Sequence, residues 1–214
     1  MCIRDRSKDG FHWNRENKKP FLPVSEDFHA WNAGNVQSTA GSPLIVGDSL
    51  YFYVSGRYNS KPKHDSNFAT GLAMLRRDGF VSMRAGRKEG YIEIKTQIPA
   101  NGNYLFVNAD VKGTLAVEVL DDNGQPMEGF TKKDCISMKK SDKTKQMISW
   151  EKHPGVTSLV GKTVRLKFYL NQADIYAFWI SAWQTGESGG YTGGGGPGLS
   201  DEGIDTPMDK LKNN

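Results

Sequence analysis

Cysteine is nearly absent from this 214-residue chain, which contains only Cys2 and Cys135. Cys2 lies in the first six residues, which we interpret below as an adapter scar, and this leaves Cys135 alone. The sequence therefore predicts neither a disulfide framework nor the paired cysteine spacing of a zinc site. We interpret Cys135 as a small, half-buried apolar residue. Histidine is also scarce, and no ligand spacing links its four positions, His12, His29, His64 and His153. We therefore expect neither a metal nor a cofactor.

Long apolar runs and concentrated charge are missing too. No stretch approaches the ~20 apolar residues of a membrane-spanning helix, so we expect no membrane segment. The 28 Lys and Arg residues are scattered among 24 Asp and Glu residues, and the net charge is only +4. Nucleic-acid binding requires a concentrated basic patch, so we expect no nucleic-acid partner. Nothing in the sequence predicts an oligomeric state.

The first six residues, "MCIRDR", have no apolar run, helical period or strand alternation. They resemble the translation of a transposon-adapter sequence used in DNA library preparation, and we expect residues 1–6 to be such a scar. The gene would then extend upstream of Ser7, and the chain would be a fragment. A missing signal peptide would carry no information, so a secreted or periplasmic parent protein stays open.

Short strands and tight turns occupy residues 7–85, the first of three zones. The clearest hairpin is "SPLIVGDSLYFYVSG", with a turn at Gly47 and Asp48. Both faces of its second arm, residues 50–55, are apolar or aromatic, as in strands covered on both sides inside sandwiches and propeller blades. "SKDGFHW" and "RRDGFVSM" share an Asp-Gly-Phe turn, in which Asp caps the turn and Gly supplies a positive φ. The first also resembles the Asp-box that closes hairpins in propeller glycosidases.

Residues 86–184 predict a second domain, an antiparallel β-sandwich. Apolar residues alternate with polar ones, for example at Val164, Leu166 and Phe168, which is typical of strands with one buried face. We expect six strands, in "GYIEIKTQI", "NYLFVNADV", "GTLAVEVLDDNG", "KQMISW", "TVRLKFYL" and "DIYAFWISAW", and one helical turn in "PGVTSLVG". Residues 185–214 are rich in glycine and charge, and we expect a disordered tail. The predicted fold class is all-β.

The stretch "FHAWNAGNVQSTAGSPLIV" suggests a binding function. Strand interiors disfavour Asn, so amides here indicate either a bend or a polar ligand. Amide groups beside an indole suit a sugar, because they can bond its hydroxyls while the ring stacks on its apolar face. We predict that the substrate-contacting residues are Trp31, Asn32, Asn35, Gln37 and Arg57. In the alternative interpretation the amides satisfy loop backbone and Trp31 lies in the core.

Catalytic residues cannot be assigned from the first zone. Glycoside hydrolysis normally needs two carboxylates, one with a pKa raised by burial. The acidic residues of this zone lie at turns or in polar loops, and only Glu26–Asp27 could supply one member of such a pair. We therefore leave the catalytic residues unknown.

A family resemblance extends this interpretation. "SKDGFHWNRENKKPFLPVSE", "WNAGNVQS", "LYFYVSGR", "TGLAMLRRDGFVSM" and "YAFWIS" together resemble the C-terminal portion of bacterial glycoside hydrolase family 32-like proteins. The resemblance spans about Ser7 to Ser181. It implies the last blade of a five-bladed propeller followed by a β-sandwich. It also implies that the catalytic carboxylates lie in earlier blades, since Trp-Met-Asn-Asp-Pro-Asn-Gly and similar motifs do not occur here.

Two other hypotheses stay open. In one, the sandwich is a non-catalytic carbohydrate-binding module whose stacking platform consists of solvent-facing Tyr169, Tyr176 and Trp183. In the other, the sandwich is purely structural and binds no ligand.

Overall fold

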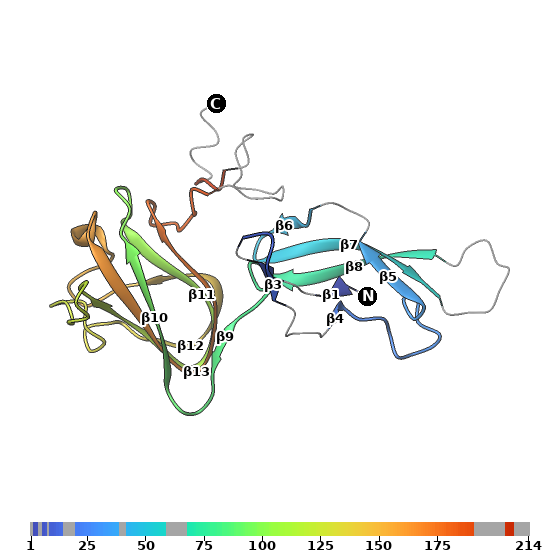
Figure 1. The fold of residues 1–214 in the computed structure, drawn as a ribbon, viewed down its shortest axis with the longest axis horizontal. Helices are drawn as coiled ribbons and strands as arrows, with labels where there is room; N and C mark the ends of the chain where they lie inside the picture. The colour runs from blue at the N-terminus through green and yellow to red at the C-terminus, as the bar shows by residue number, and fades with distance from the viewer. Residues whose placement is uncertain are drawn as a thin grey trace. The chain divides into compact units, whose positions relative to one another are not determined.

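The computed structural model describes residues 2–3, 6–7, 9–14, 20–38, 42–58, 68–190 and 204–207. These residues form β-strands and one short 3-10 turn, with no α-helix among them, which confirms the all-β prediction (Figure 1). In this part of the chain no helix is long and apolar enough to cross a membrane. The elements are β1 Cys2–Ile3, β2 Arg6–Ser7, β3 Trp13–Asn14, β4 Pro20–Leu22, β5 Asn35–Ser38, β6 Leu44–Val46, β7 Ser49–Arg57, β8 Phe68–Arg76, β9 Met83–Ala85, β10 Gly90–Gln97, β11 Tyr104–Leu120, β12 Met138–Ile148, η1 Thr157–Leu159 and β13 Thr163–Ser181.

The chain divides into two compact units. The first contains Met1–Leu44 and Leu50–Leu75, and the second contains Ile45–Ser49 and Arg76–Asn214. The boundary predicted after residue 85 falls at the end of β9, a strand that pairs with β13 of the second unit.

The first unit is built on a small sheet in which β7 is central. Strands β5 and β8 pair with β7. Strand β6 pairs with it as well, although its residues Ile45 and Val46 are grouped with the second unit. The predicted hairpin between β6 and β7 is present, and Gly47 has the positive φ of 57° that its turn requires. Two further strand pairs, β1–β4 and β2–β3, include residues of the expected adapter scar. Backbone groups of any sequence can form such pairs, so the pairing does not test the origin of residues 1–6. Their interpretation as a scar stays a prediction.

The Asp-Gly turn at the start of the chain has the expected geometry. Strands β2 and β3 form a hairpin around it, and Gly10 has a φ of 79°. The Asp9 carboxylate accepts hydrogen bonds from the backbone N–H groups of Phe11 (2.9 Å) and His12 (2.8 Å). At the second Asp-Gly-Phe stretch the prediction is wrong, because Asp78 and not Gly79 has the positive φ, which is 53°. The following strand β9 joins the sheet of the second unit.

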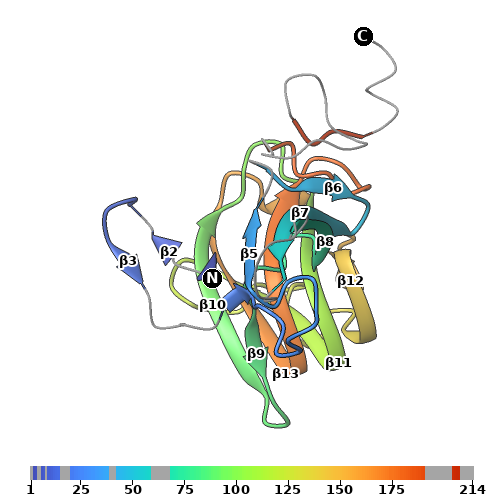
Figure 2. The same cartoon turned by 90° about the vertical axis from the view of Figure 1, so that its right-hand side faces the viewer.

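The second unit is one five-stranded antiparallel sheet curled into a half-barrel. The strand order is β10-β13-β11-β12 (Figure 2). The fifth strand, β9, pairs with residues 173–175 of β13, beyond the part that pairs with β10. The predicted one-face-buried alternation is present, and the apolar faces enclose a single core. Four of the six expected strands merge into two, because β11 and β13 are each continuous where the sequence pattern suggests a break.

Two bulge lines interrupt the pairing at the same levels on neighbouring strands. At the first, Tyr176 of β13 is an extra residue opposite Asn108 and Ala109 of β11. At the second, Lys112 and Gly113 of β11 are opposed by single residues on both sides, Gln172 of β13 and Lys140 of β12. Gln172 and Lys140 have positive φ angles of 43° and 45°. Because bulges bend strands and increase their twist, these lines account for the curl of the sheet.

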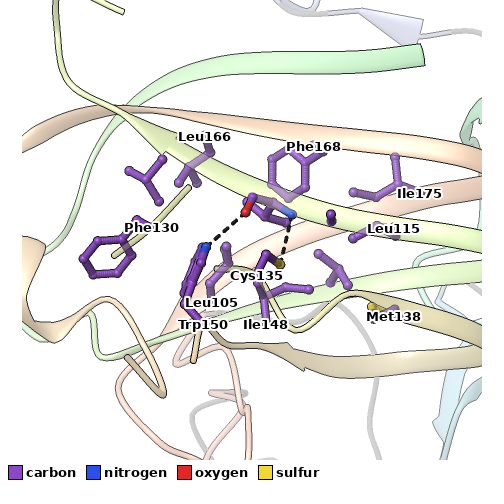
Figure 3. Packing of buried hydrophobic residues seen from close by; sticks show 14 of the residues in the cluster. Leu105, Leu115, Phe130, Cys135, Met138, Ile148, Trp150, Leu166, Phe168 and Ile175 are labelled. Atoms are coloured by element: carbon purple, nitrogen blue, oxygen red, sulfur yellow. Dashed lines mark hydrogen bonds between the residues drawn. The ribbon is translucent and has the colours of Figure 1, made fainter. Parts of the chain in front are cut away.

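Strand β12 pairs with β11 only as far as Leu115. Beyond that residue, side chains bond backbone groups on the same edge of β11. The Trp150 indole N–H donates to the carbonyl of Val117 at 3.0 Å, and the Val117 N–H donates to the Cys135 sulfur at 3.2 Å (Figure 3). All three residues are buried. Burial raises the pKa of the Cys135 thiol. Cys135 is therefore a core residue, as predicted, and it is more fully buried than expected.

Parts of the predicted disordered tail have defined contacts. The backbones of Gly189 and Gly190 exchange hydrogen bonds with Asp205, and the Asp205 carboxylate accepts from the N–H of Ser188 at 2.7 Å. Residues 191–203 and 208–214 of the tail lie outside the described residues. The predicted helical turn is present as η1.

Candidate functional site

The pairing of β5 with β7 brings three of the predicted contact residues together. Asn35 lies directly opposite Arg57, and Gln37 lies opposite Ser55. Residues that are opposite each other, or two apart on one strand, share a face of the sheet. Asn35, Gln37, Ser55 and Arg57 therefore form one polar cluster, which we call the amide face.

Trp31 lies on the other face of the same sheet. Val36, between Asn35 and Gln37, is opposite Gly56, so both belong to the face that the amides do not share. A Cβ atom on Gly56 would come within 2.3 Å of the Trp31 ring, and one on Gly71 of β8 within 2.2 Å. The indole thus lies flat over two glycines on adjacent strands. One sugar ring cannot contact both Trp31 and the amide face.

An exposed aromatic ring does lie on the amide face. The Arg57 guanidinium carbon is 4.6 Å from the centroid of the Phe68 ring, in the position of a cation–π contact. Phe68 is 59% exposed, and Tyr53, two residues before Ser55, is 45% exposed. Asn32 lies half-buried in the turn that precedes β5.

The rest of this face along β8 is apolar and open. Leu72 and Met74 alternate with less exposed residues and are 46% and 66% exposed. Large exposed apolar areas on soluble proteins commonly mark contacts with ligands or other polypeptides.

The three aromatic residues of the alternative platform lie on the second unit, and other groups cover each of them. Lys132 Nζ is 4.2 Å from the Tyr169 ring centroid, and the Tyr169 hydroxyl donates to Glu118 at 2.7 Å. The Arg76 guanidinium lies 5.0 Å above the Tyr176 ring. The Trp183 ring lies against Gly189. These contacts do not combine the aromatics into one exposed platform.

The register of the second sheet creates a group of carboxylates that the sequence reasoning missed. Asp142 of β12, Asp110 of β11 and Asp174 of β13 are directly opposite one another, and Arg84 of β9 is opposite Asp174. This acidic row lies between the two bulge lines. The sequence carries only a partial signal for it, since Asp110 lies inside an expected strand, Asp174 begins another, and Asp142 lies outside the expected strands. Only the register shows that the three meet.

The electrostatics of the acidic row do not suit general-acid catalysis. Partial burial acts to raise the pKa of Asp174, but hydrogen bonds from Arg84 and Ser82, at 2.8 Å each, outweigh it and leave that pKa lowered. A general acid in glycoside hydrolysis needs a raised pKa. The Asp142 carboxylate is bonded to Arg76.

Among the described residues, the remaining carboxylates and histidines form no cluster that could hold a metal ion. Asp27 caps its own turn by accepting from the His29 N–H at 3.0 Å, and Glu26 beside it is exposed. Among the residues that the structure describes, no three His, Cys, Asp or Glu side chains could hold a metal ion. His64 lies outside these residues.

Comparisons with protein-family models, with curated proteins and with solved structures find no match for this chain.

Proposed function

We propose that the chain belongs to a glycosidase that acts on an oligo- or polysaccharide, and that the amide face forms part of its sugar-binding wall. The observation that carries the proposal is the direct opposition of Asn35 and Arg57, with Gln37 two residues along. In this proposal the first unit is the last blade of a propeller, and the second, a half-barrel of one sheet, takes the place of the accessory β-sandwich that the family 32-like resemblance implies.

The chemistry of the amide face supports sugar binding. A side-chain amide can donate to one hydroxyl and accept from its neighbour, and a guanidinium adds further donors. Phe68 and Tyr53 supply apolar rings beside these groups, which suits the mixed polar and apolar surface of a pyranose or furanose. Trp31 then has a supporting role, since it packs β7 and β8 together from the other side.

The experiment is a binding titration with inulin, levan and other glycans. We expect Asn35→Ala and Gln37→Ala each to weaken binding about tenfold, because each removes a hydrogen-bonding group that contacts the ligand. Gln125→Ala, which removes an exposed amide from the second unit, is the matched control and should leave the affinity unchanged. Unaltered binding by both amide-face variants would refute the proposal.

The same titration separates the alternative binding module. Loss of affinity in Tyr169→Ala, Tyr176→Ala or Trp183→Ala, with Gln37→Ala silent, would favour a ligand on the second unit. We expect no glycosidase activity from this chain alone, and hydrolysis at enzyme-like rates would contradict its assignment as a non-catalytic part.

A further inference from the structure

A line of cations crosses the outer surface of the second unit along the second bulge line. Lys139 and Lys140 come from β12, Lys112 comes from β11, and Arg87 and Lys88 come from the turn between β9 and β10. All five residues are exposed. We call this set the basic line. The sequence does not reveal it, because its members come from three separate segments.

Hydrogen bonds and register place these segments next to one another. The Gln172 N–H donates to the carbonyl of Gly86 at 2.8 Å, and the Asn171 side-chain amide donates to the carbonyl of Arg87 at 2.7 Å. The turn is therefore fixed beside β13 at its bulge. On the other side of β13, Asn171 is opposite Thr114 of β11, which is in turn opposite Lys139.

The cations of the basic line lack ion-pair partners. Within the described part of the chain, none of the five has a carboxylate within the 4.0 Å of an ion pair. Several other cations on this unit are paired, namely Lys95, Lys132, Lys145, Arg165 and Lys167. Lys152 and Lys162, like the basic line, have no ion pair among the described residues. Because like charges gathered on one surface repel one another, an anionic ligand would stabilise this arrangement.

The spacing and the neighbouring groups favour one class of polymer. Adjacent strands are about 4.8 Å apart. Lys112 therefore lies about one strand spacing from the lysines of β12, whereas β13, which contributes no cation, separates Lys112 from Arg87 and Lys88. Charges spread over several strands in this way suit an extended polyanion. The acidic row lies about two residues further along the strands, where its carboxylates can accept hydrogen bonds from hydroxyl groups. A ligand that carries both carboxylates and hydroxyls complements the two rows together.

We propose that the second unit binds an acidic, uronate-containing polysaccharide across the basic line. DNA fits less well, because none of the five residues is an aromatic that could stack bases, and its backbone has no free hydroxyl groups along its length that the acidic row could bind. The proposal concerns a different surface from the amide face, so failure of the sugar-wall proposal leaves it standing.

The experiment measures binding of the whole chain to polygalacturonate and alginate, with neutral dextran and duplex DNA as comparison ligands. We expect binding to both polyuronates that weakens between about 20 and 300 mM NaCl as screening increases, and no binding to dextran. The double variant Lys112→Gln/Lys139→Gln should lose about tenfold in affinity, since it removes two contacting charges.

The matched control is Lys152→Gln/Lys162→Gln, which makes the same change in net charge at two exposed lysines away from the basic line. It should bind polyuronate within about twofold of the unaltered chain. Failure of the unaltered chain to bind, an equal loss in the control variant, or tighter binding of DNA than of polyuronate would each overturn the proposal.

Discussion

The indole ring of Trp31 lies against Gly56, with a ring carbon 2.3 Å from the position that a Cβ atom would take. Gly71 meets the same ring on the neighbouring strand. The contact is possible only because both residues lack a side chain. Substitution at either glycine therefore tests how the first sheet is held together.

We expect Gly56→Ala and Gly71→Ala to destabilise the first unit by about 1–3 kcal/mol, because the added methyl group forces the indole off the sheet. Gly86→Ala is the control, since a Cβ there would have no atom within 4 Å. Urea unfolding followed by tryptophan fluorescence measures the difference. Equal stability of all three variants would show that the indole does not depend on the glycines.

Replacement of Trp150 by Phe should weaken the half-barrel by about 1–3 kcal/mol, because the buried carbonyl of Val117 would lose its hydrogen-bond donor. Phe retains most of the apolar contact with the core, so the loss reports mainly on the hydrogen bond. Thermal unfolding followed by circular dichroism provides the measurement. Trp13→Phe, at an exposed position in the first unit, serves as the control.

Charge in the acidic row should affect stability in opposite directions at two neighbouring positions. Asp110→Asn should stabilise the second unit at pH 7 by about 0.2–1 kcal/mol, because like charges directly opposite one another repel. Asp174→Asn should destabilise it by about 1–2 kcal/mol, because the change weakens hydrogen bonds from Arg84 and Ser82 to a charged acceptor.

The pH dependence of Asp174→Asn follows from the lowered pKa of Asp174. A carboxyl with a lower pKa in the folded state stabilises the fold above its unfolded value of about 3.9, and this contribution is lost as the pH falls through the folded pKa. The difference in the free energy of unfolding between Asp174→Asn and the unaltered chain should thus be largest at pH 7 and decrease below pH ~4.

Tyr169 should be among the last tyrosines to ionise. Burial and the hydrogen bond to Glu118 raise its pKa to about 12. Its neutral form favours the fold below the unfolded value of about 10, and this contribution is lost as the pH rises through 12. NMR titration of labelled tyrosine should show a late signal that disappears in Tyr169→Phe and persists in Tyr91→Phe. A midpoint near 10 for that signal would contradict the structure.

Local patterns predicted the short-range features well. The turn at Asp9 and Gly10 depends only on adjacent residues, and it forms as expected. The alternation at Val164, Leu166 and Phe168 likewise identified their buried face correctly.

Features that depend on register or on irregular backbone could not be predicted in this way. The sequence suggested two strands in place of β13, because the buried positions change from Leu170 to Ala173 across the bulge at Gln172. It also grouped Trp31 with Asn35, because amide groups beside an indole suit a sugar. The turn between them sends the indole to the opposite face, and no local signal indicates its direction.

The three residues between Gln172 and Tyr176, which lie between the two bulges of β13, limit how the sequence of a related chain can change. In a regularly alternating β13, Asp174 would have the same orientation as Leu170 and Phe178, and its charge would enter the hydrocarbon interior. The same two bulges therefore bend the sheet and keep the charge of Asp174 on its surface. A related chain that straightened this strand would have to exchange Asp174 for an apolar residue at the same time.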